Sequence, residues 1–183
     1  VPTLGPAIGP ATPFDLASLT KPMATTLVAM RLLTARRLEL ATPAARWLPA
    51  LPSTITVGHL LGHASGLPGH RPLYERLWAG DLDGAGDPRS ALIAMAAATP
   101  PATAPGQAAV YSDLGYVVLG AVLERAGDAP LEELTAAAHR DLGLTATGFV
   151  DLRPPRAAAW FTAPPVATER DAHRGLVAGE VHD

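Results

Sequence analysis

The sequence of 183 residues predicts a mixed α/β protein, of which this chain supplies mainly the helical region. Several segments show the apolar spacing of a helix, whereas almost none alternates between apolar and polar residues as a strand does. Residues 18–37 and 116–122 are so apolar that a helix formed there needs a large buried partner, such as a sheet. We therefore expect most of the sheet to lie outside this chain, which we expect to be truncated at both ends.

The helical segments are bounded by recognisable start and stop signals. Pro22 marks the start of the first helix, because proline fits a first helical turn but not a helix interior. Gly127 and Asp128 end a later helix, as glycine commonly does after a last turn. The helices are expected at about residues 18–37, 57–63, 89–98, 112–126 and 130–142.

The remaining segments are rich in proline and glycine and are expected to form loops. Residues 109–111 and 148–150 are the best short strand candidates, and the chain beyond Phe149 is expected to be irregular. No internal repeat and no linker divides the chain. We therefore expect residues 1–183 to form a single partial domain.

Composition and charge exclude several classes of function. Apolar residues make up 48% of the chain and charged residues 17%, which is typical of a soluble globular protein. The net charge is −3 and no basic stripe occurs, so nucleic acid is not an expected partner. No apolar run is long enough to span a bilayer, and no intact signal peptide is present, which leaves localisation open. The absence of cysteine excludes disulfides, thiolate catalysis and cysteine-ligated zinc.

Lysine is used once in this chain. Of the 14 basic residues other than histidine, 13 are arginine and one is Lys21. Arginine does not release its proton in a protein, whereas a buried lysine can act as a general base. Chance is the simpler explanation for a sole lysine, so its neighbours decide whether it has a chemical role.

The segment Ser18-Leu19-Thr20-Lys21 has the pattern S-x-x-K. On a helix, residues three apart lie on one face, which brings a serine hydroxyl within reach of a lysine amine. Serine needs a neighbouring base to become a nucleophile, and lysine can be that base only if its pKa falls well below the usual value. A serine helix cap with a solvated lysine is the alternative interpretation. We favour a nucleophile and base pair over this alternative for three reasons: Pro22 follows the motif, an apolar helix lies behind it, and Lys21 is the only lysine in the chain.

A second candidate element is Tyr111-Ser112-Asp113, at the start of a predicted helix. A tyrosine there can present its hydroxyl to a cleft and, beside a cation, take up and release protons. Ser112 or Asp113 is expected to cap the helix.

Two weaker patterns involve His59 and His63. They are four residues apart and could bind zinc on one helix face, but Leu60 stands where the metalloprotease motif has glutamate, and His70 is only a loose third ligand. Packing and turn-capping histidines are the favoured interpretation. The G-x-S-x-G nucleophile motif is not met around Ser65, which lies one position late.

The motifs together resemble the serine β-lactamase and penicillin-binding-protein superfamily, in particular its class C β-lactamase-like esterases and peptidases. The resemblance covers nearly the whole chain in order and spacing. It is carried by residues 14–22 around the S-x-x-K motif, by residues 55–68, by Pro105-Gly106 with residues 111–116, which resemble the Tyr-x-Asn region, and by the tail 179–183.

The resemblance implies an α/β fold with an antiparallel sheet and an acyl-enzyme formed at Ser18. Lys21 and Tyr111 would share the acid and base roles, and the Ser18 backbone N–H would supply half of the oxyanion hole. Asp113, a supporting residue, stands where the family more often has asparagine. An acid there could pair with Lys21 and raise its pKa, which would oppose a free-amine base, or it could accept a hydrogen bond that positions the lysine. The expected substrates are small esters, amides, β-lactams or D-amino-acid peptides, with no cofactor and no metal.

The third family motif, Lys- or His-x-Gly on a strand, is expected beyond residue 183. His173-Arg174-Gly175 fits the letters but comes too early, and we interpret it as coincidence. Without that strand, the chain alone is expected to be inactive. A catalytically silent penicillin-binding sensor is the main alternative function, and a histidine-ligated metal hydrolase is the weaker one. Oligomeric state cannot be predicted.

Overall fold

The computed structural model describes residues 8–80, 86–151, 165–171 and 175–179. The chain forms two compact units. The terminal unit consists of Val1–Thr20 with Ala146–Asp183, and the helical unit consists of Lys21–Thr145. In the described part of the chain, every helix is too short or too polar to cross a membrane.

The first predicted helix is built from three kinds of helical turn. A 3₁₀ turn at Ala17–Leu19 (η1) ends the terminal unit, a π-helix at Lys21–Thr26 (η2) opens the helical unit, and α1 runs over Leu27–Thr34. The helix ends about three residues before its predicted end, because Arg36 adopts a left-handed backbone with φ 53°. π-turns are rare and are often found at functional sites.

The other predicted helices are confirmed with small shifts of their ends. They are α2 (Val57–Leu61), α4 (Pro88–Ala98), α5 (Asp113–Gly127) and α6 (Leu131–Asp141). Sequence analysis missed α3 (Leu73–Trp78) and the 3₁₀ turn η3 (Ala44–Arg46). Both are short, and a segment of one or two turns carries too few positions to show a helical period.

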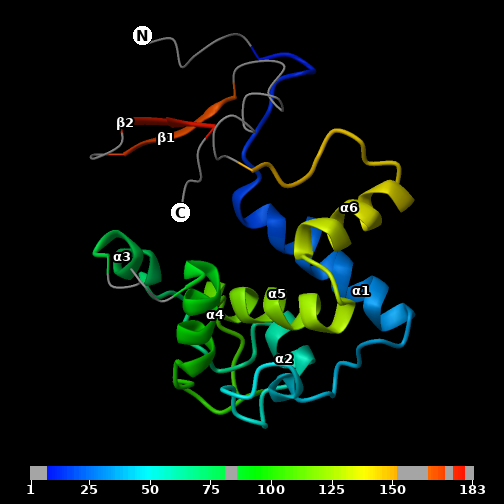
Figure 1. The fold of residues 1–183 in the computed structure, drawn as a ribbon, viewed down its shortest axis with the longest axis vertical. Coiled ribbons are helices and arrows are strands. Elements are labelled where there is room, and N and C mark those ends of the chain that lie inside the picture. The colour runs from blue at the N-terminus through cyan, green and yellow to red at the C-terminus, as the bar shows by residue number, and fades with distance from the viewer. Residues whose placement is uncertain (1–7, 81–85, 152–164, 172–174, 180–183) are drawn as a thin grey trace. The chain divides into compact units, whose positions relative to one another are not determined.

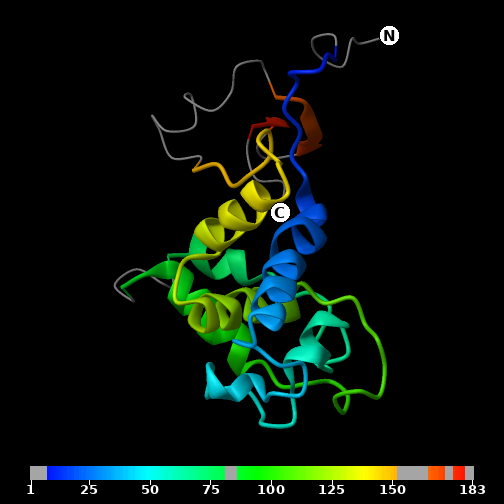
Figure 2. The same ribbon diagram turned by 90° about the vertical axis from the view of Figure 1, so that its right-hand side faces the viewer.

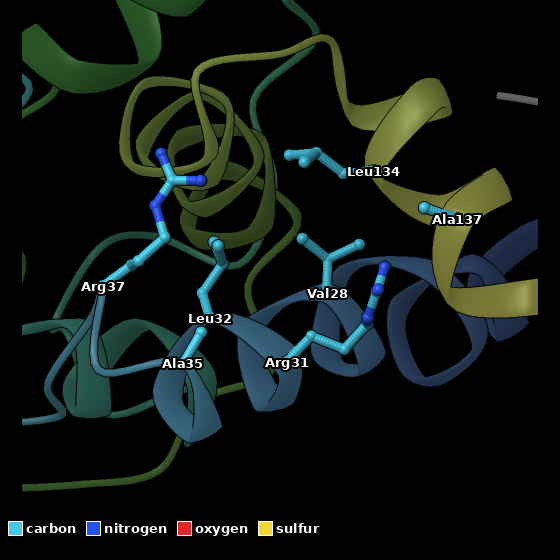
Figure 3. A pocket seen from close by; sticks show the side chains of 7 residues that line it. All are labelled: Val28, Arg31, Leu32, Ala35, Arg37, Leu134 and Ala137. Carbon is cyan, nitrogen blue, oxygen red and sulfur yellow. The ribbon is translucent and has the colours of Figure 1, made fainter. Parts of the chain in front are cut away.

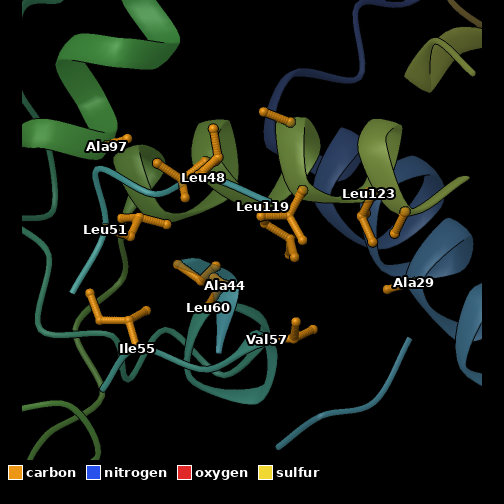
Figure 4. Packing of buried hydrophobic residues seen from close by; sticks show 14 of the residues in the cluster. Ala29, Ala44, Leu48, Leu51, Ile55, Val57, Leu60, Ala97, Leu119 and Leu123 are labelled. Atoms are coloured by element: carbon orange, nitrogen blue, oxygen red, sulfur yellow. The ribbon is translucent and has the colours of Figure 1, made fainter. Parts of the chain in front are cut away.

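Helix α5 forms the centre of the helical unit (Figures 1 and 2). It contacts α1, α2, α4 and α6. Leu119 and Leu123 of α5 are fully buried, and Val57 and Leu60 of α2 lie in the same apolar cluster (Figure 4). Burial of each such side chain stabilises the fold by about 1.5–3 kcal/mol. This packing fixes the N-terminal end of α5, at which the candidate site is found.

The terminal unit contains a two-stranded antiparallel sheet. Strands β1 (Ala167–Asp171) and β2 (Gly175–Ala178) pair with Arg170 opposite Leu176, and the register shifts between Ala167 and Glu169. The prediction that the chain beyond Phe149 is irregular is therefore wrong for these residues. Val177 is fully buried, so β2 has an inward face. The residues of the predicted irregular region at 152–164 lie outside the described residues.

The two strand candidates are not confirmed. Residues 109–111 and 148–150 are both without regular structure. The N–H of Val110 donates to the carbonyl oxygen of His63 at 2.8 Å, and this segment leads directly into α5. The backbone of residues 109–111 thus pairs with a turn rather than with a strand.

Candidate active site

Lys21 lies at the start of the π-helix with its amine among groups from α5. Its side chain is only 15% exposed, and its Nζ donates a hydrogen bond to Asp113 Oδ1 at 2.7 Å. The same nitrogen lies 4.8 Å from the centre of the Tyr111 ring and 5.7 Å from that of Tyr116. The sole lysine therefore points into an aromatic and acidic cluster rather than into solvent.

The lowered pKa that a lysine base requires is not found at Lys21. Burial disfavours the charged amine, but hydrogen bonds to Asp113 and Tyr111 and the Coulombic attraction of both residues outweigh it. Together they raise the pKa of Lys21 above its ordinary value of 10.5. These contacts therefore favour the charged form of the Lys21 amine.

Tyr111 and Asp113 are placed by the cap of α5. Ser112 is the N-cap: its Oγ accepts from the N–H of Gly115 at 3.0 Å and donates to the carbonyl oxygen of Pro68 at 2.7 Å. Ser112 is 1% exposed, so it is anchored on both sides, whereas Tyr111 is 52% exposed. The cap thus fixes the backbone while leaving the phenol accessible from solvent.

The segment after α2 approaches the same cap very closely. The N–H of Asp113 donates to the carbonyl oxygen of Gly69 at 2.8 Å. A Cβ at Gly69 would lie 2.9 Å from the carbonyl oxygen of Tyr111, so only glycine fits there without a shift of the backbone. The predicted turn at residues 65–69 is an irregular segment with bends at Ser65 and Gly69, and the carbonyl oxygens of Pro68 and Gly69 hold residues 112 and 113.

His63 is a residue of this cluster that sequence analysis did not assign to the site. Its ring centre lies 4.7 Å from that of Tyr111 and 4.7 Å from that of Tyr116. Its Nδ1 accepts a hydrogen bond from the N–H of Ser112 at 3.0 Å. His63 belongs to residues 55–68, which carry part of the family resemblance. That pattern alone does not reveal that His63 faces residues 110–112.

Burial and the positive charge of Lys21 lower the pKa of His63 below its ordinary value of 6.5, against the opposing pull of Asp113. Because Nδ1 accepts a hydrogen bond, the neutral ring carries its proton on Nε2. His63 is therefore a neutral histidine beside a permanent ammonium.

Ser18 lies in the terminal unit, in the middle of the 3₁₀ turn Ala17–Leu19. The turn begins with a left-handed residue, since Ala17 has φ 43° and its N–H donates to Asp15 Oδ1 at 2.8 Å. Non-glycine residues rarely adopt this backbone, and such conformations cluster at functional sites. The structure brings Lys21, Tyr111 and Asp113 together within the helical unit. The assignment of Ser18 to the same site continues to rest on the S-x-x-K spacing.

The histidines that suggested a zinc site have other partners. His59 forms a capping box with Thr56: its N–H donates to Thr56 Oγ1, and its Nδ1 accepts from the N–H of Thr56. The predicted capping and packing roles of His59 and His63 are thus confirmed. His70 Nδ1 lies 3.9 Å from Asp113 Oδ2. Among the described residues, no group of three or more acidic, histidine or cysteine side chains is placed to hold a metal ion.

A separate cavity of about 310 Å³ is lined by residues of α1, the segment that follows it and α6 (Figure 3). Its lining includes the apolar side chains of Val28, Leu32 and Leu134 and two arginines, Arg31 and Arg37. Arg31 pairs with Asp141 at 2.7 Å. Arginine is the only titratable residue type in this lining, so the cavity offers no nucleophile or base.

The fold and the residue pattern define a protein of the penicillin-binding and serine β-lactamase fold class. The profile of the Beta-lactamase family matches residues 5–181, and the chain belongs to that family. The fold class and the resemblance predicted from the sequence are thereby confirmed.

Individual relatives cover most of this chain. A protein of Escherichia coli (strain K12) named "Putative D-alanyl-D-alanine carboxypeptidase" is 29% identical over 147 residues, which are 74% of this chain and 33% of that protein. The solved structure of EstCE1, a hydrolase with promiscuous acyltransferase activity, matches 93% of this chain and 46% of its own, with 28% identity and a TM-score of 0.68.

A penicillin-binding protein from Bacillus halodurans matches 92% of this chain and 50% of its own, with 25% identity and a TM-score of 0.65. The chain thus spans between a third and a half of the length of these relatives. Their shared fold agrees with a mainly helical chain that carries one small sheet.

Proposed function

We propose that this chain carries the nucleophile and the proton-transfer residues of a serine hydrolase that acts on esters or amides. Ser18 is the nucleophile, Lys21 and Tyr111 move its proton, and Asp113 supports Lys21. The observation that carries the proposal is the position of the Lys21 amine, 2.7 Å from Asp113 and 4.8 Å from the Tyr111 ring. A solvated lysine on a helix surface would have neither contact.

The raised pKa of Lys21 determines how the proton moves. With Lys21 charged, Tyr111 is the proposed acceptor of the Ser18 proton, and the ammonium beside it stabilises negative charge on the tyrosine oxygen. The Ser18 oxygen attacks the carbonyl carbon, and the carbonyl oxygen becomes the oxyanion. When the tetrahedral intermediate collapses, Tyr111 returns the proton to the leaving group and the acyl group stays on Ser18.

Deacylation repeats these steps with water in place of serine. Tyr111 takes a proton from water, the resulting hydroxide attacks the ester carbonyl, and Ser18 leaves with the proton. The backbone N–H of Ser18 is proposed as one oxyanion donor. The family pattern places the second donor on a strand that carries Lys- or His-x-Gly, which we expect beyond residue 183. Of the three residues that match these letters within the chain, His173 and Arg174 lie outside the described residues and Gly175 begins β2.

The proposed substrate class is a small ester, amide or D-amino-acid peptide. EstCE1 is a hydrolase with acyltransferase activity and the Escherichia coli relative is named for a carboxypeptidase, so the relatives support acyl transfer without selecting one acyl donor. We also propose that residues 1–183 belong to one domain of this fold and to the class C-like esterase and peptidase branch. The family match over residues 5–181 supports a single domain.

One observation favours a second function. Asp113 forms an ion pair with Lys21 where the family more often has asparagine, and it contributes to the raised pKa of that lysine. If slow proton transfer limits the attack of water more than the attack of Ser18 on a reactive acyl donor, the acyl group stays on Ser18. Such a protein would be a covalent penicillin-binding sensor rather than an enzyme.

Covalent labelling of the intact protein distinguishes the two functions. A fluorophosphonate and a fluorescent penicillin would be compared on wild type and on Ser18→Ala, with hydrolysis of p-nitrophenyl esters followed in parallel. Labelling that requires Ser18, together with steady ester hydrolysis, supports the hydrolase. Labelling that requires Ser18 without turnover supports the sensor. Equal labelling of Ser18→Ala would reject both, and loss of activity on chelation would point to a metal hydrolase instead.

A further inference from the structure

His63 contacts the backbone on both sides of Tyr111. Its carbonyl oxygen accepts from the N–H of Val110 at 2.8 Å, and its Nδ1 accepts from the N–H of Ser112 at 3.0 Å. Its ring also lies against that of Tyr111, with 4.7 Å between the ring centres and 33° between the planes. One residue therefore holds the tyrosine by its two neighbours and by its ring.

The backbone of His63 is itself in a left-handed conformation, with φ 53°. This conformation is uncommon for a residue other than glycine, and it persists where the surroundings determine it. Here it directs both the carbonyl oxygen and the ring of His63 toward the loop at residues 110–112. On its other side, the ring stacks on Tyr116, whose hydroxyl donates to the carbonyl oxygen of Leu61 at 3.2 Å.

We propose that His63 is a positioning residue for Tyr111, and that it performs this role only as a neutral ring with its proton on Nε2. The inference rests on the proposed function of Tyr111 in proton transfer. The acceptor at Nδ1 sets the path of the backbone through Ser112, and the ring limits the movement of the phenol. His63 touches no reacting atom and acts through Tyr111.

Protonation of His63 would break this arrangement. A charged imidazole carries hydrogen on both ring nitrogens, so Nδ1 would become a donor facing the N–H of Ser112, which is also a donor. The charged ring would face the Lys21 ammonium, with Asp113 as the opposing acid and Tyr111 and Tyr116 as the other titratable groups beside it. The Nδ1 of His70 also lies 3.9 Å from Asp113 Oδ2. Acylation of Ser18 should therefore decline at acid pH, below the ordinary histidine pKa, in step with protonation of His63.

Two variants test separately the hydrogen-bond acceptor of His63 and its aromatic ring. His63→Asn keeps an acceptor at the δ position and tolerates the left-handed backbone, but it does not titrate. His63→Phe keeps an aromatic ring and leaves the N–H of Ser112 without its acceptor. His70→Asn is the control, because His70 is 60% exposed and lies near the same carboxylate.

The experiment measures the rate of Ser18 labelling by a fluorophosphonate in the intact protein between pH 4.5 and 8. We expect His63→Phe to slow labelling by about 100-fold at pH 7, the scale of a misplaced catalytic group. His63→Asn should keep most of the rate and lose the decline at acid pH, whereas His70→Asn should retain the decline. A His63→Phe rate equal to that of wild type, or an unchanged acid decline in His63→Asn, would overturn the inference.

A second measurement does not depend on catalysis. Nitrogen-15 spectra of labelled histidine report which ring nitrogen of His63 carries the proton, and they follow its titration. A neutral ring protonated on Nε2 supports the inference, and one protonated on Nδ1 overturns it. If wild type is not labelled at Ser18 at all, the proposed function fails, and these spectra still decide the state of His63.

Discussion

The Nζ of Lys21 and the Oδ1 of Asp113 form an ion pair at 2.7 Å that joins the start of the π-helix to the start of α5. The two residues are 92 positions apart in the chain. The lysine is largely buried and the carboxylate is 36% exposed, so the pair lies at the border between the apolar cluster and solvent. This ion pair favours the charged form of the lysine, and it is the basis on which we propose Tyr111 as the proton acceptor.

The first prediction concerns the pKa of Lys21. Because Lys21 is the only lysine, carbon-13 labelling of lysine gives a single side-chain signal that can be titrated without assignment. The pKa should lie above 10.5 in wild type and should fall in Asp113→Asn, since the amide keeps a hydrogen-bond acceptor but removes the negative charge. A wild-type pKa below 10.5 would restore lysine as the general base. Asp128→Asn, on the distant end of α5, serves as the control.

The second prediction follows from linkage between protonation and folding. The pKa of Lys21 is raised in the folded protein, so its stabilising contribution is complete below about pH 10.5 and is lost as the pH rises through the folded value. The difference in free energy of unfolding between wild type and Lys21→Met should therefore shrink above pH 10.5. Its size at pH 8 should be about 0.5–1 kcal/mol, because Asp113 is partly exposed to water. Urea unfolding of both proteins across this pH range provides the measurement.

The third prediction compares Lys21→Arg with Lys21→Gln. If the ammonium acts as a cation beside Tyr111, arginine should preserve part of its effect, and glutamine should reduce acylation by about 10²–10⁴-fold. We expect Lys21→Arg to be acylated at least about 10 times faster than Lys21→Gln. Its rate should still be lower than that of wild type, because the guanidinium is larger than an ammonium and planar. Equal inactivity of both variants would indicate a neutral amine as the base. Burst kinetics with a p-nitrophenyl ester would report the acylation rates.

Three of the four candidate site residues lie together in the structure, whereas neither strand candidate forms a strand. The S-x-x-K and Tyr-Ser-Asp segments were identified because they are local patterns, and their residues Lys21, Tyr111 and Asp113 do meet in the structure. The charge state of Lys21 was left open by the sequence because it depends on a partner 92 positions away. A sequence pattern does not show whether Asp113 points toward the amine or away from it.

The longer helices were predicted because each has several turns over which an apolar face repeats, whereas the short α2 was predicted with the help of the turn residues that follow it. The hairpin of β1 and β2 was missed, since Thr168, Glu169, Arg170 and Asp171 are polar in succession and show no alternation. His63 was interpreted only as a packing or capping residue. Its role at Tyr111 arises from a left-handed turn that brings residues 63 and 112 together, which no local period reveals.

The fourth prediction tests the cap that holds Tyr111. Ser112→Ala removes the acceptor for the N–H of Gly115 and the donor to the carbonyl oxygen of Pro68, both within a buried site. The free energy of unfolding should fall by about 1–2 kcal/mol, the usual cost of a lost helix cap and an unsatisfied group. Ser53→Ala, at an exposed turn, should change it by less than about 0.5 kcal/mol. Equal stability of the two variants would show that the cap does not hold the loop.

The fifth prediction concerns the packing that places the start of α5, and it uses two neighbouring positions of that helix. Leu119 is fully buried in the apolar cluster, whereas Val117 is 44% exposed. Leu119→Ala leaves a cavity and should lower the free energy of unfolding by about 2–5 kcal/mol. Val117→Ala should change it by less than about 0.5 kcal/mol, because alanine also favours the helix. Since the caps and contacts around Lys21 depend on α5, Leu119→Ala should also slow labelling of Ser18 at temperatures where wild type is still folded. Similar stabilities of the two variants would contradict the central position of α5.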